Sequence, residues 1–166
     1  MSIQRDIVSR MTGELSERYR DCGILVMGSV QRGEERPDSD IDLFVVFEGD
    51  GRLGLTHETS PEGVKIDLAL FPKATFLRQF EDEWFLYWGF SRATIVHDPT
   101  GVAAHCQDLV RRRFKKNPHI DAAWEQQQAE VLKHKADRTY TLAFPQWSDF
   151  ASHVRRIADP DSAEDR

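Results

Sequence analysis

Two strand-like segments carry carboxylates where a soluble core would normally hold apolar side chains. Residues 41–47 read IDLFVVF and residues 64–71 read VKIDLALF, and both segments are rich in β-forming residues. Asp42 and Asp67 interrupt these runs, and Asp40 stands two positions before Asp42. Because side chains alternate across a strand, Asp40 and Asp42 share one face. If the two strands are neighbours in one sheet, three carboxylates meet at a single point.

Such a cluster needs a counter-charge. At about 5 Å and an effective dielectric near 20, each pair of like charges repels by roughly 3 kcal/mol. Three such pairs would approach the whole stability of a domain. Protons or a divalent cation must neutralise the cluster, and carboxylate oxygens are the ligands that suit magnesium. We therefore predict a metal site formed by Asp40, Asp42 and Asp67.

A glycine and a serine follow another buried strand, which is predicted at residues 24–27. Gly28 lets a phosphate approach the backbone, while Ser29 offers a hydroxyl group and a backbone N–H. Ser29 is equally suited to cap a helix, and both roles can hold at once. Arg32 is close enough in sequence to neutralise phosphate charge, although a solvated side chain is as plausible, and Ser39 lies next to the first carboxylate. These four residues form the predicted nucleotide-binding set.

The arrangement resembles a known signature. A Gly-Ser pair at 28–29, ten further residues and Asp-Ile-Asp-Leu at 40–43 resemble the motif of the polymerase-β superfamily of nucleotidyltransferases. Asp67 resembles the third carboxylate of that motif. The stretch from 27 to 49 is similar to small bacterial nucleotidyltransferases, including the minimal ones paired with helical toxins and the kanamycin nucleotidyltransferase-like group. The resemblance covers roughly residues 20–71.

This resemblance implies a fold and a chemistry. The expected fold is α+β, a nucleotidyltransferase fold with a short mixed sheet flanked by helices and a small C-terminal helical extension. Asp40 and Asp42 would bind two Mg²⁺ ions, for which Mn²⁺ can substitute. Ser29 would contact the triphosphate, and Asp67 would bind one metal or activate the acceptor hydroxyl. The implied reaction transfers a nucleoside monophosphate and releases pyrophosphate; our hypothesis is AMP from ATP to a hydroxyl of a small molecule or protein.

Small size and a short helical tail also favour a second hypothesis, an antitoxin-like binding module that pairs with a helical toxin partner. The two hypotheses can coexist, because some relatives act by modifying their partner. Dimerisation is one way to complete the acceptor pocket, so a homodimer is a candidate assembly. The acceptor, the base preference and the general base stay open.

The remaining pattern predicts the domain organisation. Apolar residues recur every four positions from Ile3 to Tyr19, as on one face of an amphipathic helix. Further along we expect a weak segment at 55–60, a helix at 73–87, an edge strand at 93–96 and helices at 101–114 and 119–140. The predicted units are a nucleotidyltransferase domain at 1–98, a helical extension at 99–158 and a flexible tail at 159–166.

Composition limits the partners. The net charge of −6 disfavours a long nucleic acid, whose binding depends on lysine and arginine. No stretch reaches the roughly 20 apolar residues of a membrane span, and the first residues do not resemble a signal peptide. We therefore expect a cytoplasmic protein without membrane association.

Three other patterns have simpler interpretations. Residues 49–54 match G-x-G-x-x-G, but the following segment lacks helical periodicity, so a dinucleotide site is not expected. The aromatic residues between 84 and 90 could stack on a base or acceptor ring, although such clusters more often belong to the core. Arg92 and Asp98 flank the predicted edge strand, where they could line a pocket or remain solvated.

Overall fold

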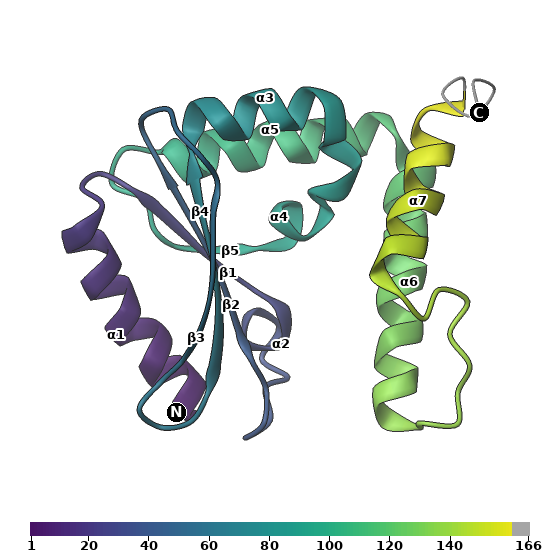
Figure 1. Cartoon of the computed structure of the whole chain (residues 1–166), viewed down its shortest axis with the longest axis horizontal. Helices are drawn as coiled ribbons and strands as arrows, with labels where there is room; N and C mark the ends of the chain where they lie inside the picture. Colours follow the sequence, from purple (N-terminus) through teal and green to yellow (C-terminus); the bar gives the residue numbers. More distant parts are fainter. Residues whose placement is uncertain (161–166) are drawn as a thin grey trace.

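The computed structural model describes residues 1–160 and contains one five-stranded mixed sheet with helices on both faces (Figure 1). The strand order is β3-β4-β2-β1-β5, in which β2 and β4 are parallel and the other neighbours are antiparallel. The fold expected from the sequence is confirmed. The strands are β1 (Gly23–Met27), β2 (Ile41–Phe47), β3 (Gly54–Thr59), β4 (Lys65–Pro72) and β5 (Thr94–His97).

The helices fall into an N-terminal layer, a layer on the opposite face of the sheet, and a C-terminal pair. In chain order they are α1 (Ile3–Arg18), α2 (Gly28–Arg32), α3 (Lys73–Glu83), α4 (Trp88–Arg92), α5 (Val102–Lys116), α6 (Pro118–Ala136) and α7 (Trp147–Ala158). A short 3₁₀ turn, Trp84–Leu86, separates α3 from α4. No helix of residues 1–160 is long and apolar enough to cross a membrane.

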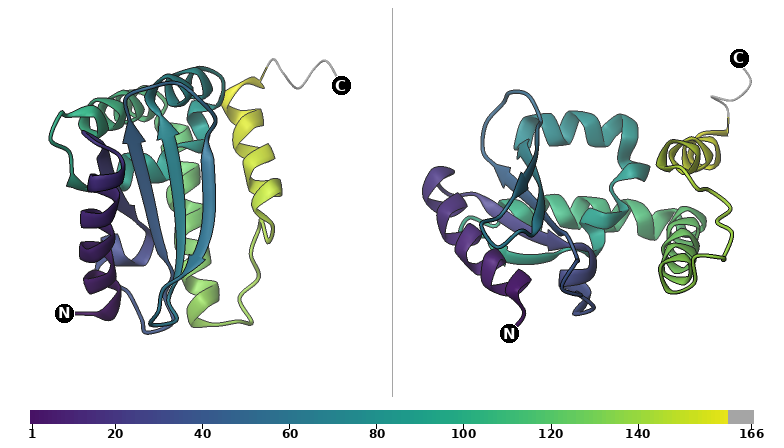
Figure 2. Two further views of the ribbon diagram at one scale, coloured as in Figure 1. Left: turned by 60° about the vertical axis from the view of Figure 1, so that its left-hand side comes forward. Right: turned by 60° about the horizontal axis from the view of Figure 1, so that its bottom comes forward.

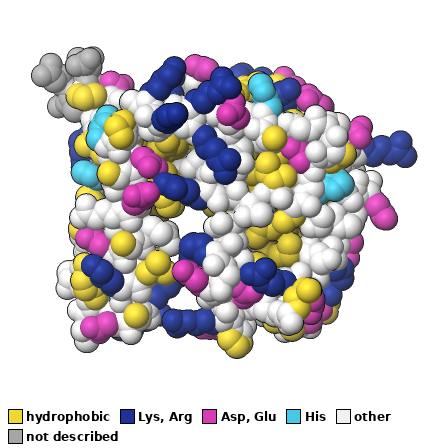
Figure 3. Space-filling view, turned by 180° about the vertical axis from the view of Figure 1, so that it is seen from behind, with side chains coloured by type: hydrophobic (Ala, Val, Ile, Leu, Met, Phe, Trp, Pro, Cys, Tyr) yellow, Lys and Arg dark blue, Asp and Glu magenta, His cyan; other side chains and the backbone are white. Residues whose placement is uncertain are grey.

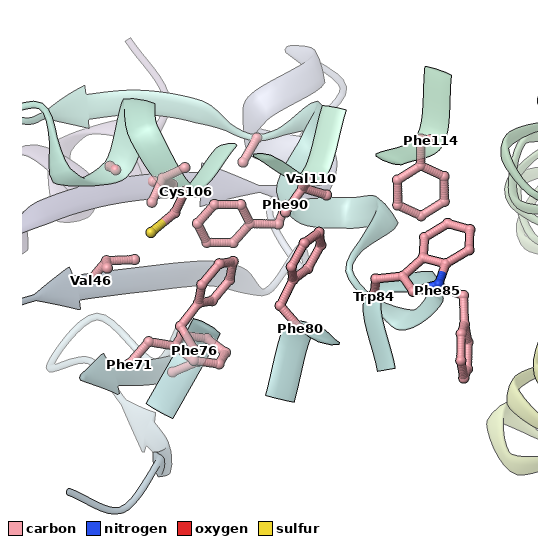
Figure 4. Packing of buried hydrophobic residues seen from close by; sticks show 14 of the residues in the cluster. Val46, Phe71, Phe76, Phe80, Trp84, Phe85, Phe90, Cys106, Val110 and Phe114 are labelled. Atoms are coloured by element: carbon pink, nitrogen blue, oxygen red, sulfur yellow. The ribbon is translucent and has the colours of Figure 1, made fainter. Parts of the chain in front are cut away.

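Strand β2 separates two hydrophobic clusters. Leu43 and Val45 pack with the buried face of α1, whereas Phe44 and Val46 pack on the opposite side with residues of α3, α4 and α5. Figure 4 shows the aromatic side chains that fill the second cluster. By the alternation of the strand, Asp42 belongs to the face of Phe44 and Val46. The predicted site therefore opens on the side of the C-terminal helices.

The C-terminal pair, α6 and α7, stands beside the sheet (Figures 1 and 2). Trp124 of α6 attaches the pair to the body: it donates a 2.8 Å hydrogen bond to the carbonyl of Phe85 and stacks on Trp88 with ring centroids 5.7 Å apart. Phe150 of α7 packs on the same indole. Helix α5, by contrast, contributes Cys106 and other residues to the core of the sheet. The division of the chain at residue 98 stays a prediction.

Two helices differ from those predicted. The helix expected at 73–87 ends at Glu83, because Trp84 and Phe85 turn into the core through the 3₁₀ segment. The helix expected to reach residue 140 ends at Ala136, where the side chain of Asp137 accepts hydrogen bonds from the backbone and hydroxyl of Thr139. Helix α7 was not predicted. The tail predicted at 159–166 lies, from residue 161 onward, outside the described residues.

Candidate active site

Asp42 and Asp67 occupy paired positions on the two parallel strands. The register of β2 and β4 sets Asp42 directly opposite Asp67, so their side chains emerge from the same face of the sheet. Both residues are half-buried, whereas Asp40 is exposed and lies just before β2. The condition stated from the sequence, that the two acidic strands be neighbours, is met.

The Gly-Ser turn lies against this pair. Met27, the last residue of β1, pairs with Asp42, so Gly28 begins α2 directly beside the carboxylate. A Cβ at Gly28 would stand 2.6 Å from Oδ2 of Asp42, and the residue has a φ of +71°. Both features require glycine. Met27, not Ser29, occupies the N-cap of α2, and within residues 1–160 the Ser29 hydroxyl makes no hydrogen bond.

The charges of the site oppose one another. The pKa of Asp42 is raised, first by burial and then by the negative charges of Asp67 and Asp40. Lys135 of α6 and Arg32 of α2 act in the opposite direction and lower that pKa. Asp67 and Asp40 thus both act against the charge of Asp42, and two cations from separate helices compensate part of their effect.

His57 is a site residue that the sequence did not reveal. It pairs with Asp67 across β3 and β4, and its Nδ1 lies 2.6 Å from Oδ1 of Asp67. The imidazole side chain is 80% exposed, so its other nitrogen faces solvent. The signal that could have found it is the hairpin: the tight turn at 60–63 between β3 and β4 fixes a register in which residues 57 and 67 are opposite each other.

Two members of the predicted nucleotide set have partners within the protein. Nε of Arg32 forms an ion pair with Glu34 at 2.7 Å, yet Arg32 also lies near enough to influence Asp42. The hydroxyl oxygen of Ser39 accepts a 2.8 Å hydrogen bond from the backbone N–H of Arg36. Ser39 thus closes a turn immediately before Asp40, while Arg32 remains on the wall of the site.

The aromatic residues between 84 and 90 belong to the core, which is the more common location for such a cluster. Phe90 is 1% exposed and Trp84 is 7% exposed. Trp88 is partly buried; it stacks on Trp124, and its indole N–H donates a 2.7 Å hydrogen bond to Asp121. Arg92 also forms an ion pair with Asp121 at 3.2 Å. Trp88 and Arg92 therefore attach α6 to the body, while Trp84 and Phe90 fill the core.

The carboxylates suit a divalent cation by their chemistry, although they are not gathered into a finished site. Within the described part of the chain, no three or more His, Cys, Asp or Glu side chains are arranged so that they could hold a metal ion as they stand. Oδ1 of Asp67 is engaged by His57, and Asp40 is exposed. Asp42 and Asp67 nevertheless present adjacent oxygen donors whose charge is only partly compensated, the donor chemistry that magnesium prefers.

Comparison with known proteins identifies the class. The family model of the nucleotidyltransferase domain matches residues 8–95, which is more than half of the chain. The chain therefore belongs to the nucleotidyltransferase domain family of the polymerase-β superfamily, as the motif predicted. The matched segment contains the Gly-Ser turn, the three aspartates and His57.

Among solved structures, the chain is similar to a nucleotidyltransferase-like protein from Exiguobacterium sibiricum 255-15, with 14% sequence identity and a TM-score of 0.48. The similarity covers 98% of this chain and 65% of that chain. No curated protein matches the sequence. Members of the nucleotidyltransferase family typically use divalent metals, and the domain implies a nucleotide substrate.

Proposed function

We propose that this protein is a magnesium-dependent nucleotidyltransferase that transfers AMP from ATP to a hydroxyl group of a small molecule or protein and releases pyrophosphate. The observation that carries the proposal is the pairing of Asp42 with Asp67 beside Gly28. Two carboxylates on adjacent parallel strands, next to a turn without a side chain, combine cation ligands with room for a phosphate. Family membership supports nucleotidyl transfer as the general activity.

The negative wall of the site would hold the metal. Asp40, Asp42 and Asp67 are the ligands in this proposal, and a bound divalent cation would neutralise developing charge on the phosphates. Asp42 is the central member, because it pairs with Asp67 and lies two residues from Asp40. The raised pKa of Asp42 supports this role, because a bound cation would compensate the charge that burial and the neighbouring carboxylates disfavour.

The Gly-Ser turn would hold the triphosphate. With no side chain at Gly28, a phosphate can approach the backbone at the start of α2. The Ser29 hydroxyl, which has no partner within residues 1–160, is available to donate to a phosphate oxygen. Arg32 would add positive charge, in exchange for part of its interaction with Glu34.

Helix α6 supplies a second, basic wall. Seen from behind, the molecule is open between the C-terminal helix pair and the body, with Lys, Arg, Asp and Glu side chains around the gap (Figure 3). Lys135 is exposed, forms no ion pair within residues 1–160, and influences Asp42 electrostatically. A magnesium-bound triphosphate between these walls would meet carboxylates on one side and an ammonium group on the other. This complementarity favours a nucleotide over an uncharged ligand.

The decisive experiment separates binding from turnover. Isothermal titration with ATP and magnesium should give a binding isotherm for the wild-type protein and none for the Asp40→Ala/Asp42→Ala variant. Equal binding by both proteins would refute the assignment of the site. Release of pyrophosphate from ATP, followed with a panel of hydroxyl-bearing acceptors, then identifies the class of acceptor; binding without release under every acceptor would argue against catalysis.

A further inference from the structure

The first turn of α1 holds the loop that leads into the acidic strand. This α2–β2 loop comprises residues 33–40, and it ends at Asp40. Gln4 is only 1% exposed although its side chain is polar. Its amide nitrogen donates to three carbonyl oxygens of the loop, which belong to Arg36 at 2.7 Å, Pro37 at 3.3 Å and Ser39 at 3.4 Å.

The turn at residues 36–39, which Gln4 contacts, is closed by two hydrogen bonds of its own. The backbone N–H of Ser39 donates to the carbonyl of Arg36 at 2.9 Å, and the Arg36 N–H donates back to the Ser39 hydroxyl at 2.8 Å. The carbonyl of Arg36 therefore accepts from within the turn and from Gln4, while the carbonyls of Pro37 and Ser39 accept from the Gln4 amide. The Gln4 amide is itself buried, where an unpaired polar group is costly, so its bonds to these carbonyls hold the turn against the start of α1.

A second contact fastens the beginning of the same loop. The hydroxyl of Ser2 and Nε of Arg5 both donate to Oε1 of Glu35 at 2.7 Å, and the Glu35 side chain is 7% exposed. Arg5 also reaches the carbonyl of Val30 in α2 at 3.4 Å. The start of α1 therefore connects the helix that follows Gly28 with the loop that precedes Asp40.

We infer that Gln4 is a positioning residue of the active site: through the turn at 36–39 it fixes where Asp40 stands relative to Asp42. The inference rests on the proposed role of these two aspartates as metal ligands. Asp40 is exposed and precedes the first hydrogen-bonded pair of β2, so the sheet alone does not fix it. The amide contacts the residue immediately before Asp40, and groups that orient metal ligands typically change metal affinity 10–100-fold when removed.

The test measures metal affinity and stability separately. Gln4→Met keeps the length of the side chain and removes the donor, whereas Ile7→Val trims a buried residue one turn along α1 that faces the sheet. Mn²⁺ binding is titrated by electron paramagnetic resonance in the presence of a nonhydrolysable ATP analogue, and thermal unfolding is recorded for each variant. We expect Gln4→Met to weaken Mn²⁺ binding about tenfold or more, and Ile7→Val to leave it unchanged.

The outcomes are distinguishable. Wild-type protein that binds no Mn²⁺ with the analogue would refute the proposed function itself. A wild-type protein that binds, together with Gln4→Met binding equally well, would overturn the positioning role and leave the proposed function intact. If Gln4→Met fails to fold, Gln4→Asn takes its place, because it keeps the amide and shortens its reach by one methylene. A wild-type Mn²⁺ affinity in that variant would also refute the inference.

Discussion

Neutralising Asp42 should stabilise the metal-free protein while abolishing its response to magnesium. Asp42 is half-buried, and burial together with Asp67 and Asp40 raises its pKa. Asp42→Asn keeps the shape of the side chain and removes one charge from this cluster. The variant should therefore be free of the repulsion that destabilises the wild-type protein, and should lack the central charged oxygen ligand of the proposed metal site.

The magnitude follows from the spacing of the strands. Residues paired across adjacent strands lie about 5 Å apart, and two unit charges at that distance repel by roughly 3 kcal/mol at an effective dielectric of 20 and about 1 kcal/mol in water. The Asp67 side chain is 48% exposed, so solvent screening brings the estimate toward the lower value. A gain of about 1 kcal/mol corresponds to a rise in Tm of about 2–4 °C for a protein of this size.

The effect should depend on pH with a defined sign. Because the folded-state pKa of Asp42 is raised above the ordinary carboxyl value near 4, the charged form is the destabilised one. Well below pH 4 the side chain is protonated in both states, and the variant and wild-type proteins should unfold alike. Between the ordinary pKa and the raised pKa of the folded state, the wild-type protein loses stability as pH rises, so the gain of the variant appears across that window and is complete above it.

Differential scanning calorimetry with chelator and with excess magnesium measures both halves of this prediction. Magnesium should raise the Tm of the wild-type protein and leave that of Asp42→Asn unchanged. Asp38→Asn, at an exposed loop position, is the control for removing one negative charge. Should Asp42→Asn melt below the wild-type protein in chelator, or respond to magnesium as the wild type does, the electrostatic account of the site would be wrong.

Three further substitutions test other parts of the site. Lys135→Ala should weaken magnesium–ATP binding about fivefold by calorimetric titration without changing Tm, whereas Lys115→Ala should change neither; equal effects of the two would remove α6 from the site. His57→Ala should lower the rate of pyrophosphate release about tenfold while Tm stays within about 2 °C, because its contact with Asp67 is exposed; an unchanged rate would make that contact incidental. Gly28→Ala should lose about 1–2 kcal/mol of stability in thermal unfolding and bind no nucleotide, since it combines a left-handed backbone with a collision against Asp42; wild-type titration curves would contradict this.

The acidic wall of the site could be predicted from the sequence because its determinants are local. Alternation within 40–42 places two carboxylates on one face, and the apolar runs around Asp42 and Asp67 identify both segments as strands. Only their adjacency had to be assumed. The partners of those carboxylates could not be found in the same way: His57 depends on the register of a hairpin, and Gln4 depends on how α1 crosses the loop.

The basic wall on α6 is harder still to predict, because its position depends on tertiary packing of residues outside the segment that matches the family. Lys135 lies outside residues 8–95, on a helix whose sequence shows no phosphate-binding motif. It reaches the neighbourhood of Asp42 because contacts such as those of Trp124 with Phe85 and Trp88 attach α6 to the body. The motif thus contains the residues proposed to hold the metal and the phosphates, while the docking of the helix pair decides what faces them. Residues that select the acceptor should accordingly be sought on α6 rather than within the motif.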